Sequence, residues 1–581
     1  MREETSDPTA GTTSTTQQYA IGISFGNSYS SIAHISGEGK VEVIANEEGD
    51  RQIPSILSYI DGEEYHGTQA KSQLIRNSKN TVAYFRDYLG KDYKSIDPTP
   101  AQNSAHPLEA NGTVAFSVHD TESETPNNVS VSEIATRHLT RLKNSASDFS
   151  GKTVTSAVLA ITTDTSDEQK AALTAAAVNT NVEILQFIPE PIAALLAYDS
   201  RATDGPISDK LVVVCDFGGN RSDVAIIASR GGMYSVLSTA HDYDLGGSQL
   251  DTVLMDYFAK EFEKKHKSDP RKDPRGLAKL RLESESVKKT LSQSATATFS
   301  VESLADGIDF RSTINRTRYD LLASKTFARF TALIEECLRK AELDVLDIDE
   351  VVMAGGTSHT PRIANNIQSL FGENTTVLAP ATSTSALNPS ELSARGAALQ
   401  ANLIQEFEKE DIEQSTHEMI TVTPHLSSAI GVVVSGQPED SFTTVIPPAT
   451  AAPARRTITI SAPKDGGDVL VRVVEGEREI EVTQPEPKAP KENGTKGEDD
   501  SDGDDDDSEE EEEEPTRSKV WRSKRTLAEA VVRGVKKGGK VEVTVHVDAD
   551  MSVAVTAREK GGKGGVRGTL GKPAVQENGH A

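Results

Sequence analysis

Short apolar runs alternate with amphipathic stretches from residue 19 to about residue 408. Runs of about four to eight apolar residues are typical of buried strands, and apolar positions that recur every three or four residues are typical of helices. The pattern predicts strands at residues 154–161, 211–215 and 351–354 and helices at residues 132–143, 249–264 and 319–341. Because strands that alternate with helices build sheets covered on both faces, we expect an α/β domain over residues 19–408.

The pattern repeats once inside this domain. Residues 23–35 align without a gap on residues 215–227, at a constant offset of 192 positions. Both copies have the pattern of a strand, a Phe-Gly turn, small polar residues and a second strand. A repeat of this length indicates domain duplication rather than a solenoid, whose units are about 20–50 residues long. A chance likeness of two buried hairpins is the alternative.

Beyond residue 424 the apolar runs become short and β-like, with prolines between them. They lie at residues 430–434, 457–461, 469–474, 479–483, 541–547 and 552–558. We expect a linker at 409–424 and a β-sandwich in two parts, residues 425–484 and 518–558. An acidic disordered insertion at 485–517 separates the two parts, and residues 1–18 and 559–581 are expected to be disordered tails.

Charge is concentrated in the insertion. Residues 498–514 hold fourteen acids and no bases, which is half of the formal net charge of −28. Such a run has nothing to bury, so it acts as a solubilising spacer or as an arm for a basic partner. The remaining chain is also acidic and repels phosphate backbones, so direct binding to DNA is not expected.

Cysteine content and hydropathy bear on the compartment. Only Cys215 and Cys337 are present, outside any CxxC pattern, which argues against a disulfide scaffold or a zinc site and favours a reducing compartment. The first eighteen residues are polar, unlike a secretory signal. No apolar stretch approaches the roughly 18 residues of a membrane-spanning helix. We expect a cytoplasmic protein with no membrane partner.

Four turns rich in glycine and small polar residues punctuate the α/β domain. They consist of Gly26, Asn27, Ser28 and Tyr29; Gly218, Gly219, Asn220 and Arg221; Gly246 and Gly247; and Gly355, Gly356 and Thr357. Such turns present backbone N–H groups to a phosphate because no large side chain blocks the approach. Glycine also serves hairpin turns for conformation alone. Because the repeat places two of the four turns, a polyphosphate held between two lobes is the favoured ligand.

These turns and the segments around them resemble the heat shock protein 70 (DnaK-like) family. The similar segments occur in family order at residues 22–30, 189–194, 214–219, 285–292, 354–361, 388–391 and 395–398. The resemblance covers nearly the whole chain. It implies a two-lobed, actin-like ATPase domain followed by a β-sandwich, with ATP as the bound cofactor.

The resemblance also assigns roles by position. It implies that phosphate is held by the first three turns, together with Asp223. It implies that adenosine is held by Glu285, Lys288, Ser292, Gly355, Gly356, Thr357 and His359. Arg86 stands where the family has a lysine beside the attacking water, and Glu190 and Asp216, with Asp223, are the carboxylates that position water and ions. Magnesium is left open, and no metal ligand is assigned.

Several of these positions depart from the family pattern. Ser24 replaces the acid of the first turn, whereas its repeat equivalent, Asp216, keeps it. Arg221 replaces a small residue in the second turn, where we expect its guanidinium to bind phosphate bidentately without metal. Because phosphoryl transfer needs positioned charge, we expect ATP hydrolysis to be weak or absent. Compensating substitutions that keep slow hydrolysis are the alternative.

The C-terminal part departs as well. The linker has only Met419, Ile420 and Val422 as apolar residues, and no long helical lid follows the sandwich. Within the family, these features resemble the ribosome-associated Ssz-type members. That resemblance implies a stable complex with a J-domain protein (zuotin-like), indirect contact with the ribosome, and stimulation of a second heat shock protein 70 chaperone that folds nascent chains. Nascent polypeptide is a further candidate partner.

Two other functions stay open at this point. One is an ATP-hydrolysing foldase of the same family, which a peptide-stimulated turnover assay would reveal. The other is a nucleotide-exchange factor, whose family members carry a long insertion in the β-domain and a helical extension. This chain has the insertion but not the extension. A metabolic kinase of the actin-like superfamily is disfavoured because the β-domain has no role in such an enzyme.

Overall fold

The computed structural model describes residues 19–97, 104–123, 125–201, 208–407, 424–434, 442–462, 465–483, 516–562 and 565–570. The chain divides into two compact units, Met1–Thr416 and His417–Ala581. The predicted tail at 1–18 lies outside the described residues, as do the linker at 409–424 except for Pro424 and the acidic insertion at 485–517 except for Thr516 and Arg517. The insertion was predicted two residues too long, because Thr516 and Arg517 begin a β-strand that ends at Val535. Among the helices within those ranges, none has the length and apolarity that a membrane crossing requires.

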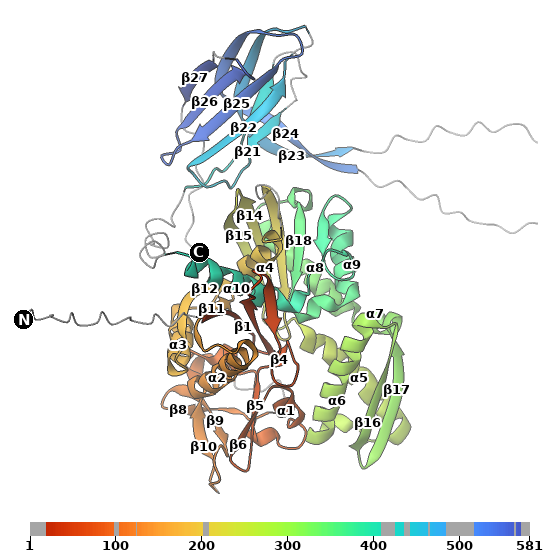
Figure 1. Cartoon of the computed structure of the whole chain (residues 1–581). Helices are drawn as coiled ribbons and strands as arrows, with labels where there is room; N and C mark the ends of the chain where they lie inside the picture. The colour runs from red at the N-terminus through yellow and green to blue at the C-terminus, as the bar shows by residue number, and fades with distance from the viewer. Residues whose placement is uncertain are drawn as a thin grey trace, which may run out of the picture. The chain divides into compact units, whose positions relative to one another are not determined.

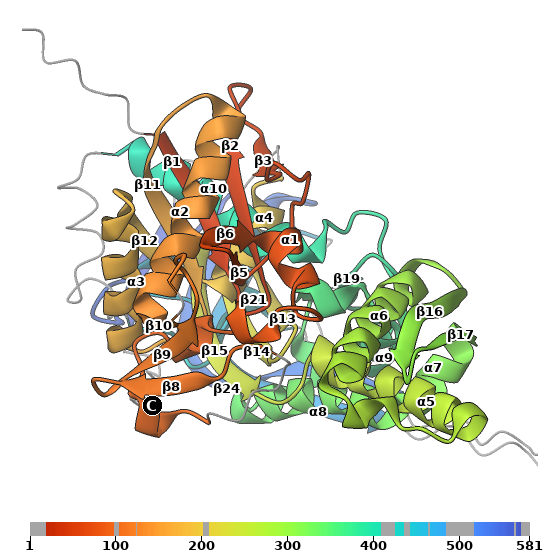
Figure 2. The ribbon, with the colours of Figure 1, turned by 90° about the horizontal axis from the view of Figure 1, so that it is seen from below.

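The first sheet of unit 1 has the strand order β12-β11-β1-β2-β3, with β4 paired to β2. Its strands are β1 (Tyr19–Phe25), β2 (Tyr29–Ile35), β3 (Val41–Ile44), β4 (Ile53–Pro54), β11 (Val154–Ile161) and β12 (Glu183–Pro189). β1 runs antiparallel to β2 and parallel to β11. Helices α2 (Val131–Ser150) and α3 (Asp167–Asn179) cover one face, and Figure 2 shows α2 lying across the strands.

The second sheet repeats this plan, with the order β15-β14-β13-β18-β19. Its strands are β13 (Lys210–Phe217), β14 (Ser222–Arg230), β15 (Met233–Asp242), β18 (Glu350–Ala354) and β19 (Thr376–Leu378). β13 is antiparallel to β14 and parallel to β18, just as β1 is to β2 and β11. The strands related by the 192-residue offset therefore have the same neighbours, which supports duplication over chance likeness.

Two helices lie between the sheets and join them (Figure 1). α10 (Leu392–Gln405) contacts β1, β2 and β11, and α4 (Glu190–Asp199) contacts β13 and β18. The helices approach closely because Gly396 has no side chain: a Cβ there would lie 1.9 Å from the Ala193 carbonyl oxygen. We call the parts of unit 1 built around the two sheets the first half and the second half.

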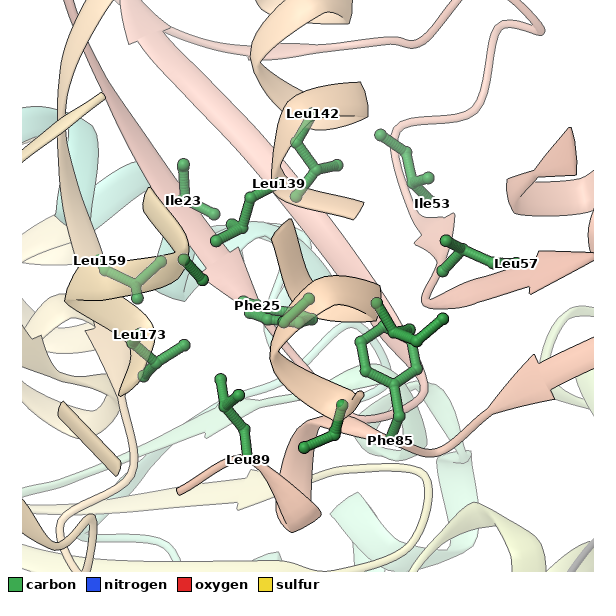
Figure 3. Close-up of a cluster of buried hydrophobic side chains, with 14 of the residues drawn as sticks. Ile23, Phe25, Ile53, Leu57, Phe85, Leu89, Leu139, Leu142, Leu159 and Leu173 are labelled. Atoms are coloured by element: carbon green, nitrogen blue, oxygen red, sulfur yellow. The ribbon is translucent and has the colours of Figure 1, made fainter. Parts of the chain in front are cut away.

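The core of the first half lies between its sheet and α2. Strand residues Ile23, Phe25 and Leu159 meet Leu139 and Leu142 of α2 (Figure 3). All of these side chains are buried. Burying a side chain of this size is worth roughly 1.5–3 kcal/mol, so this cluster holds the first repeated hairpin firmly in place.

Each half carries an addition beside its sheet. In the first half these are β5 (Ile56–Ile60), β6 (Glu63–His66), α1 (Gly67–Ser72), β7 (Thr81–Ala83), β8 (Pro107–Ala110), β9 (Thr113–Val118) and β10 (Asn127–Ser130). In the second half they are α5 (Gly247–His266), α6 (Pro274–Gln293), β16 (Thr296–Ala305), β17 (Ile308–Asn315) and α7 (Arg316–Leu322). Helices α8 (Ser324–Lys340) and α9 (Pro361–Phe371) complete the second half, with α8 against β14 and β15.

The helix predicted at residues 319–341 is wrong in one respect, because the structure has two helices there. α7 ends at Leu322 and α8 begins at Ser324, with Ala323 at φ −92° and ψ 4° between them. The break lets Tyr319 of α7 meet Phe327 of α8 edge-on, with ring centroids 5.7 Å apart. The 3.6-residue periodicity continues across the break, so it gave no sign of it.

Unit 2 consists of two four-stranded sheets, β21-β20-β23-β24 and β22-β25-β26-β27. The strands are β20 (Ala429–Val434), β21 (Thr443–Ile446), β22 (Ala454–Ser461), β23 (Gly467–Thr483), β24 (Thr516–Val535), β25 (Lys540–Val547), β26 (Val553–Glu559) and β27 (Gly565–Leu570). A core of alternating valines, among them Val471, Val543 and Val555, lies between the two sheets.

Two expectations for unit 2 were wrong. The runs at 469–474 and 479–483 are one continuous strand, β23, because β24 pairs with it along its whole length. Residues 565–570, expected within a disordered tail, form β27, because the outer edge of β26 offers backbone groups for pairing. Trp521 of β24 stacks on Phe442, with ring centroids 5.9 Å apart.

Candidate functional site

The two repeated hairpins touch each other at their turns. In each turn the glycine N–H donates to a carbonyl three residues later: Gly26 to Tyr29 at 3.1 Å and Gly218 to Arg221 at 3.0 Å. At the repeat-equivalent positions 28 and 220, Ser28 Oγ donates to Asn220 Oδ1 at 3.0 Å. A Cβ on Gly219 would lie 2.3 Å from Ser28 Oγ, so the second turn requires glycine where the two meet.

The other predicted turns pack on the second hairpin. The N–H groups of Gly247 and Ser248 donate to the carbonyls of Gly218 and Gly219 at 3.1 and 2.8 Å. This contact places the first residues of α5 against the turn. Thr357 Oγ1 donates to the Gly218 carbonyl at 2.8 Å. Gly355 has φ +80°, and a Cβ there would lie 2.4 Å from the Phe217 carbonyl oxygen.

A cavity of about 630 Å³ opens between the two halves above these turns. Of the residues predicted to hold or act on a nucleotide, all but Gly246 line it. Gly246 lies beneath the wall, where a Cβ would lie 2.7 Å from the Gly219 carbonyl oxygen. The volume lies within the range of roughly 300–1,000 Å³ that is usual for small-molecule sites.

The residues predicted for adenosine lie on the second-half wall. Glu285, Lys288 and Ser292 share one face of α6, and Lys288 Nζ donates to the Gly247 carbonyl at 2.9 Å and pairs with Asp251 at 2.8 Å. His359 Nε2 lies 3.1 Å from Ser390 Oγ. The fold thus brings together side chains of α6 and of residues 355–359, which are separated by more than sixty positions in the chain.

A first set of charged contacts joins the halves at Tyr29. The Tyr29 hydroxyl donates to Glu285 Oε1 at 2.5 Å and accepts from Lys71 and Lys289 at 2.6 and 2.8 Å. Lys71 also donates to Glu285 Oε2 at 2.6 Å. Burial alone would raise the pKa of Glu285, but the ammonium groups of Lys71 and Lys289 hold that pKa well below its usual range. We call these four residues the Tyr29 bridge.

The carboxylates predicted for water and ion positioning gather at the cavity floor. Burial raises the pKa of Glu190, the first residue of α4, although the charge of Arg86 opposes the shift. Burial and the charges of Glu190 and Asp223 raise the pKa of Asp216, the penultimate residue of β13, well above its usual value. Carboxyls that disfavour ionisation together are stabilised as anions by an added cation.

Arg221 bonds to carboxylates, which differs from the expectation that its guanidinium binds phosphate bidentately. Its Nε donates to Asp223 Oδ2 at 2.8 Å, and its Nη2 donates to Asp164 Oδ1 at 3.0 Å and also to Asp223 Oδ1. The guanidinium lies over the ring of Tyr243, 4.8 Å from its centroid. Two carboxylates within reach compete with any phosphate for the same N–H groups.

Asp164, Tyr243 and His241 complete this second set of contacts. The Tyr243 hydroxyl donates to Asp164 Oδ2 at 2.7 Å, and His241 Nδ1 lies 2.6 Å from Asp223 Oδ1. Burial would raise the pKa of Asp164, but the Arg221 charge and the Tyr243 hydroxyl hold it well below its usual range. We call Arg221, Asp164, Asp223, Tyr243 and His241 the Arg221 bridge.

Sequence reasoning missed part of the lining. The missed residues include Lys71, Tyr84, Asp251, Arg281 and Leu282. Arg281 precedes Glu285 by one helical turn, so extending the α6 face backwards would have found it. Lys71 and Tyr84 carried no such signal, because their position depends on how β5, α1 and β7 pack.

Comparisons with known proteins agree with this geometry. Residues 20–486 match the family described as Hsp70 protein. The ribosome-associated complex subunit SSZ1 of Saccharomyces cerevisiae is 43% identical over 95% of this chain and 99% of its own length. A heat shock protein 70 homologue of Schizosaccharomyces pombe is 41% identical over 94% of this chain and 95% of its own length. Heat shock cognate 70 kDa protein 3 of Dictyostelium discoideum is 32% identical over 79% of this chain and 71% of its own length.

Proposed function

This chain belongs to the heat shock protein 70 family, and from that premise we propose that it is an ATP-holding co-chaperone of the Ssz type, not a cycling chaperone. In this proposal it forms a stable complex with a J-domain protein at the cytoplasmic ribosome. There it assists nascent-chain folding by stimulating another heat shock protein 70. The 43% identity to a subunit of the ribosome-associated complex, over nearly the full length of both chains, supports this assembly.

The observation that carries the proposal is the altered chemistry of the repeated hairpins. Their turns still line the cavity, and Gly219 has no side chain that would stand between the turn and a phosphate. Yet Ser24 supplies no charge where the repeat has Asp216, and Asp223 is bonded to Arg221. ATP binding needs the glycine turns, whereas ATP hydrolysis needs the positioned acids. ATP binding therefore survives when hydrolysis is lost.

ATP fits the residues present. Asn27 Oδ1 is buried in the first turn without a hydrogen-bond partner among the described residues. With the amide turned over, its NH₂ group would donate to a phosphate at this turn. The second-half wall supplies the side chains of α6, and the turns supply glycines that leave room for a phosphate. In our proposal the two-lobed, actin-like arrangement holds the triphosphate at the turns and the base against α6.

Magnesium, when bound, would screen phosphate oxygens, and Glu190 and Asp216 would hold it. Asp223 is the poorest candidate because Arg221 and His241 already bond to it. We therefore propose ATP binding that depends only weakly on magnesium. The positive charge of Arg86 opposes the raised pKa of Glu190 and so favours its anion.

Unit 2 is proposed to bind the J-domain partner without a helical lid. All of the described secondary structure after residue 424 is β-strand, from β20 to β27. A sandwich that lacks a lid would exchange peptide quickly, so trapping of nascent chains is a lesser role in this proposal.

The competing function is a working ATPase foldase. It is favoured by one observation: Glu190 and Asp216 are both retained at the cavity floor. If these two carboxylates suffice to position the attacking water, the protein hydrolyses ATP slowly despite Ser24 and Arg221.

A single-turnover experiment distinguishes the two functions. Full-length protein is purified without added nucleotide, its bound nucleotide is measured, and loaded ATP is then followed for hours. We expect ATP to stay ATP and a J-domain protein to co-purify stoichiometrically after a salt wash. Peptide-stimulated hydrolysis that Glu190→Gln abolishes, and that Glu183→Gln at the exposed start of β12 leaves intact, would establish the foldase instead. Recovery of monomer alone would reject the complex.

A further inference from the structure

Positions 29 and 221 are equivalent in the repeat, and each side chain reaches the opposite half. Tyr29 belongs to the first hairpin and bonds to Glu285 and Lys289 of α6 in the second half. Arg221 belongs to the second hairpin and bonds to Asp164, which follows β11 in the first half. The Ser28–Asn220 hydrogen bond joins the two residues that directly precede Tyr29 and Arg221, and these two positions are also equivalent in the repeat. These two cross-half contacts are therefore related by the repeat.

The Tyr29 bridge and the Arg221 bridge lie at different parts of the cavity. The Tyr29 bridge belongs to the wall formed by α6, beside the residues predicted for adenosine. The Arg221 bridge lies at the floor, where Asp223 neighbours Glu190 and Asp216. Contacts at the floor hold the ends of β11 and β14 together without using any residue of α6.

The surroundings of the guanidinium have the composition of a cation site. Asp164, Asp223 and His241 each offer one ligand atom, and these atoms all lie within 4.8 Å of one another. Carboxylate oxygens and an imidazole nitrogen are ligands of divalent ions, and small side-chain movements would bring these atoms around one ion. Here Arg221 places its own positive charge among them and stacks on Tyr243.

We propose that Arg221 is a built-in cation that occupies this site and joins the two halves at the cavity floor, so that closure there requires neither nucleotide nor metal. Its planar fork bonds to one carboxylate from each half, which a small ion would otherwise have to coordinate. This goes beyond ATP holding, because it concerns the nucleotide-free protein. A partner that recognises the closed conformation could then bind to this protein before ATP does.

Distance measurements on nucleotide-free, full-length protein test the bridge. Spin labels are attached at Glu63, the exposed first residue of β6 in the first half, and at Asp306, in the exposed turn between β16 and β17 in the second half. We expect a narrow distance distribution in the otherwise unchanged protein and a broad, longer one in Arg221→Gln. Asp164→Asn removes the opposite end of the bridge and is expected to broaden the distribution equally, with no further change in the double variant.

Arg271→Gln is the matched control. Arg271 also binds two carboxylates, Asp256 and Asp269, but all three residues lie in the second half. It is expected to leave the distribution narrow. A distribution that stays narrow in folded Arg221→Gln and Asp164→Asn overturns the proposal. Because no turnover is measured, this result is independent of whether the protein hydrolyses ATP.

A second measurement tests the cation site itself. Nucleotide-free Arg221→Ala is titrated with Mn²⁺ and followed by electron paramagnetic resonance. We expect it to bind one more Mn²⁺ than the unchanged protein, and the added site to be lost in the Arg221→Ala, Asp164→Asn double variant. An Arg221→Ala protein that gains no Mn²⁺ would show that the guanidinium does not stand in for a metal ion.

Discussion

The two repeated hairpins have the same topology but differ in side-chain charge. β1–β2 carries Ser24 and Ser31 where β13–β14 carries Asp216 and Asp223, at the same offset of 192. Both hairpins pair with the same kinds of neighbours, so backbone geometry does not account for the difference. The two hairpins therefore share the turn geometry, whereas only the second carries the two acids. Changes that make one hairpin like the other test this division.

The largest effect is expected from Gly219→Asn, which gives the second turn the residue of the first. The new Cβ would lie 2.3 Å from Ser28 Oγ, so the two turns must separate. Overpacking of this kind costs about 2–3 kcal/mol, and we expect ATP affinity to fall about a hundredfold. Calorimetric titration measures it. The reverse swap, Asn27→Gly, creates no clash and removes one polar side chain, so affinity is expected to fall only about tenfold. Equal losses in both variants would contradict the asymmetry.

Ser24→Asp gives the first hairpin the charge of the second. A third carboxylate beside Glu190 and Asp216 repels phosphate unless a cation is present. We expect ATP to bind about tenfold more weakly in EDTA, with most of the loss recovered in magnesium. Titrations in the two buffers measure this. Thr298→Asp, on an exposed position of β16, is the control; the same weakening there would indicate a non-specific effect of charge.

Tyr29→Phe and Tyr243→Phe compare the two bridges. The Tyr29 hydroxyl has three charged partners, whereas the Tyr243 hydroxyl donates to Asp164. Losing a buried hydrogen bond to a charged group costs about 1.5–3 kcal/mol, and an exposed one less. We expect nucleotide release to quicken about tenfold in Tyr29→Phe and about twofold in Tyr243→Phe, measured by stopped flow. A larger increase in Tyr243→Phe than in Tyr29→Phe would mean that the Arg221 bridge controls nucleotide release more than the Tyr29 bridge does.

The smallest effect concerns pH. Because the pKa of Asp164 is lower in the folded protein than in the unfolded chain, its stabilisation is fully present above the ordinary pKa of about 4. That stabilisation is lost as the pH falls toward the folded-state pKa. We expect Asp164→Asn to lower the free energy of unfolding by about 1 kcal/mol at pH 6 and by less at pH 3.5. Urea unfolding at both pH values measures it. Asp306→Asn, in an exposed turn, should show no such difference; a loss for Asp164→Asn that is equal at both pH values would reject the assignment.

Much of the site was predictable from sequence because it is local. The turns at 26–29 and 218–221 are short, glycine-marked and related by the repeat, so each supports the interpretation of the other. Buried strands such as β11 and β18 were also recognisable, because continuous apolar runs have few alternatives. The break at Ala323 and the strand β27 were not, because backbone pairing and helix packing decided them.

Arg221 shows where sequence reasoning reached its limit. The sequence placed a guanidinium at the phosphate turn, and charge alone made phosphate the natural partner. Asp164, 57 positions earlier, became a neighbour only because β11 ends beside β14 across the cleft. No periodicity or spacing relates these two residues.

The sequence by itself determined the duplicated hairpins, the glycine turns and the loss of charge at Ser24, since each depends on residues adjacent in the chain. Tertiary structure alone decided which carboxylates surround Arg221, which lysines surround Tyr29, and that both bridges cross between the halves. The physical reason is distance. Hydrogen bonds and ion pairs act over a few ångströms, and only the packing of α4 and α10 between the sheets brings those distant segments within that range.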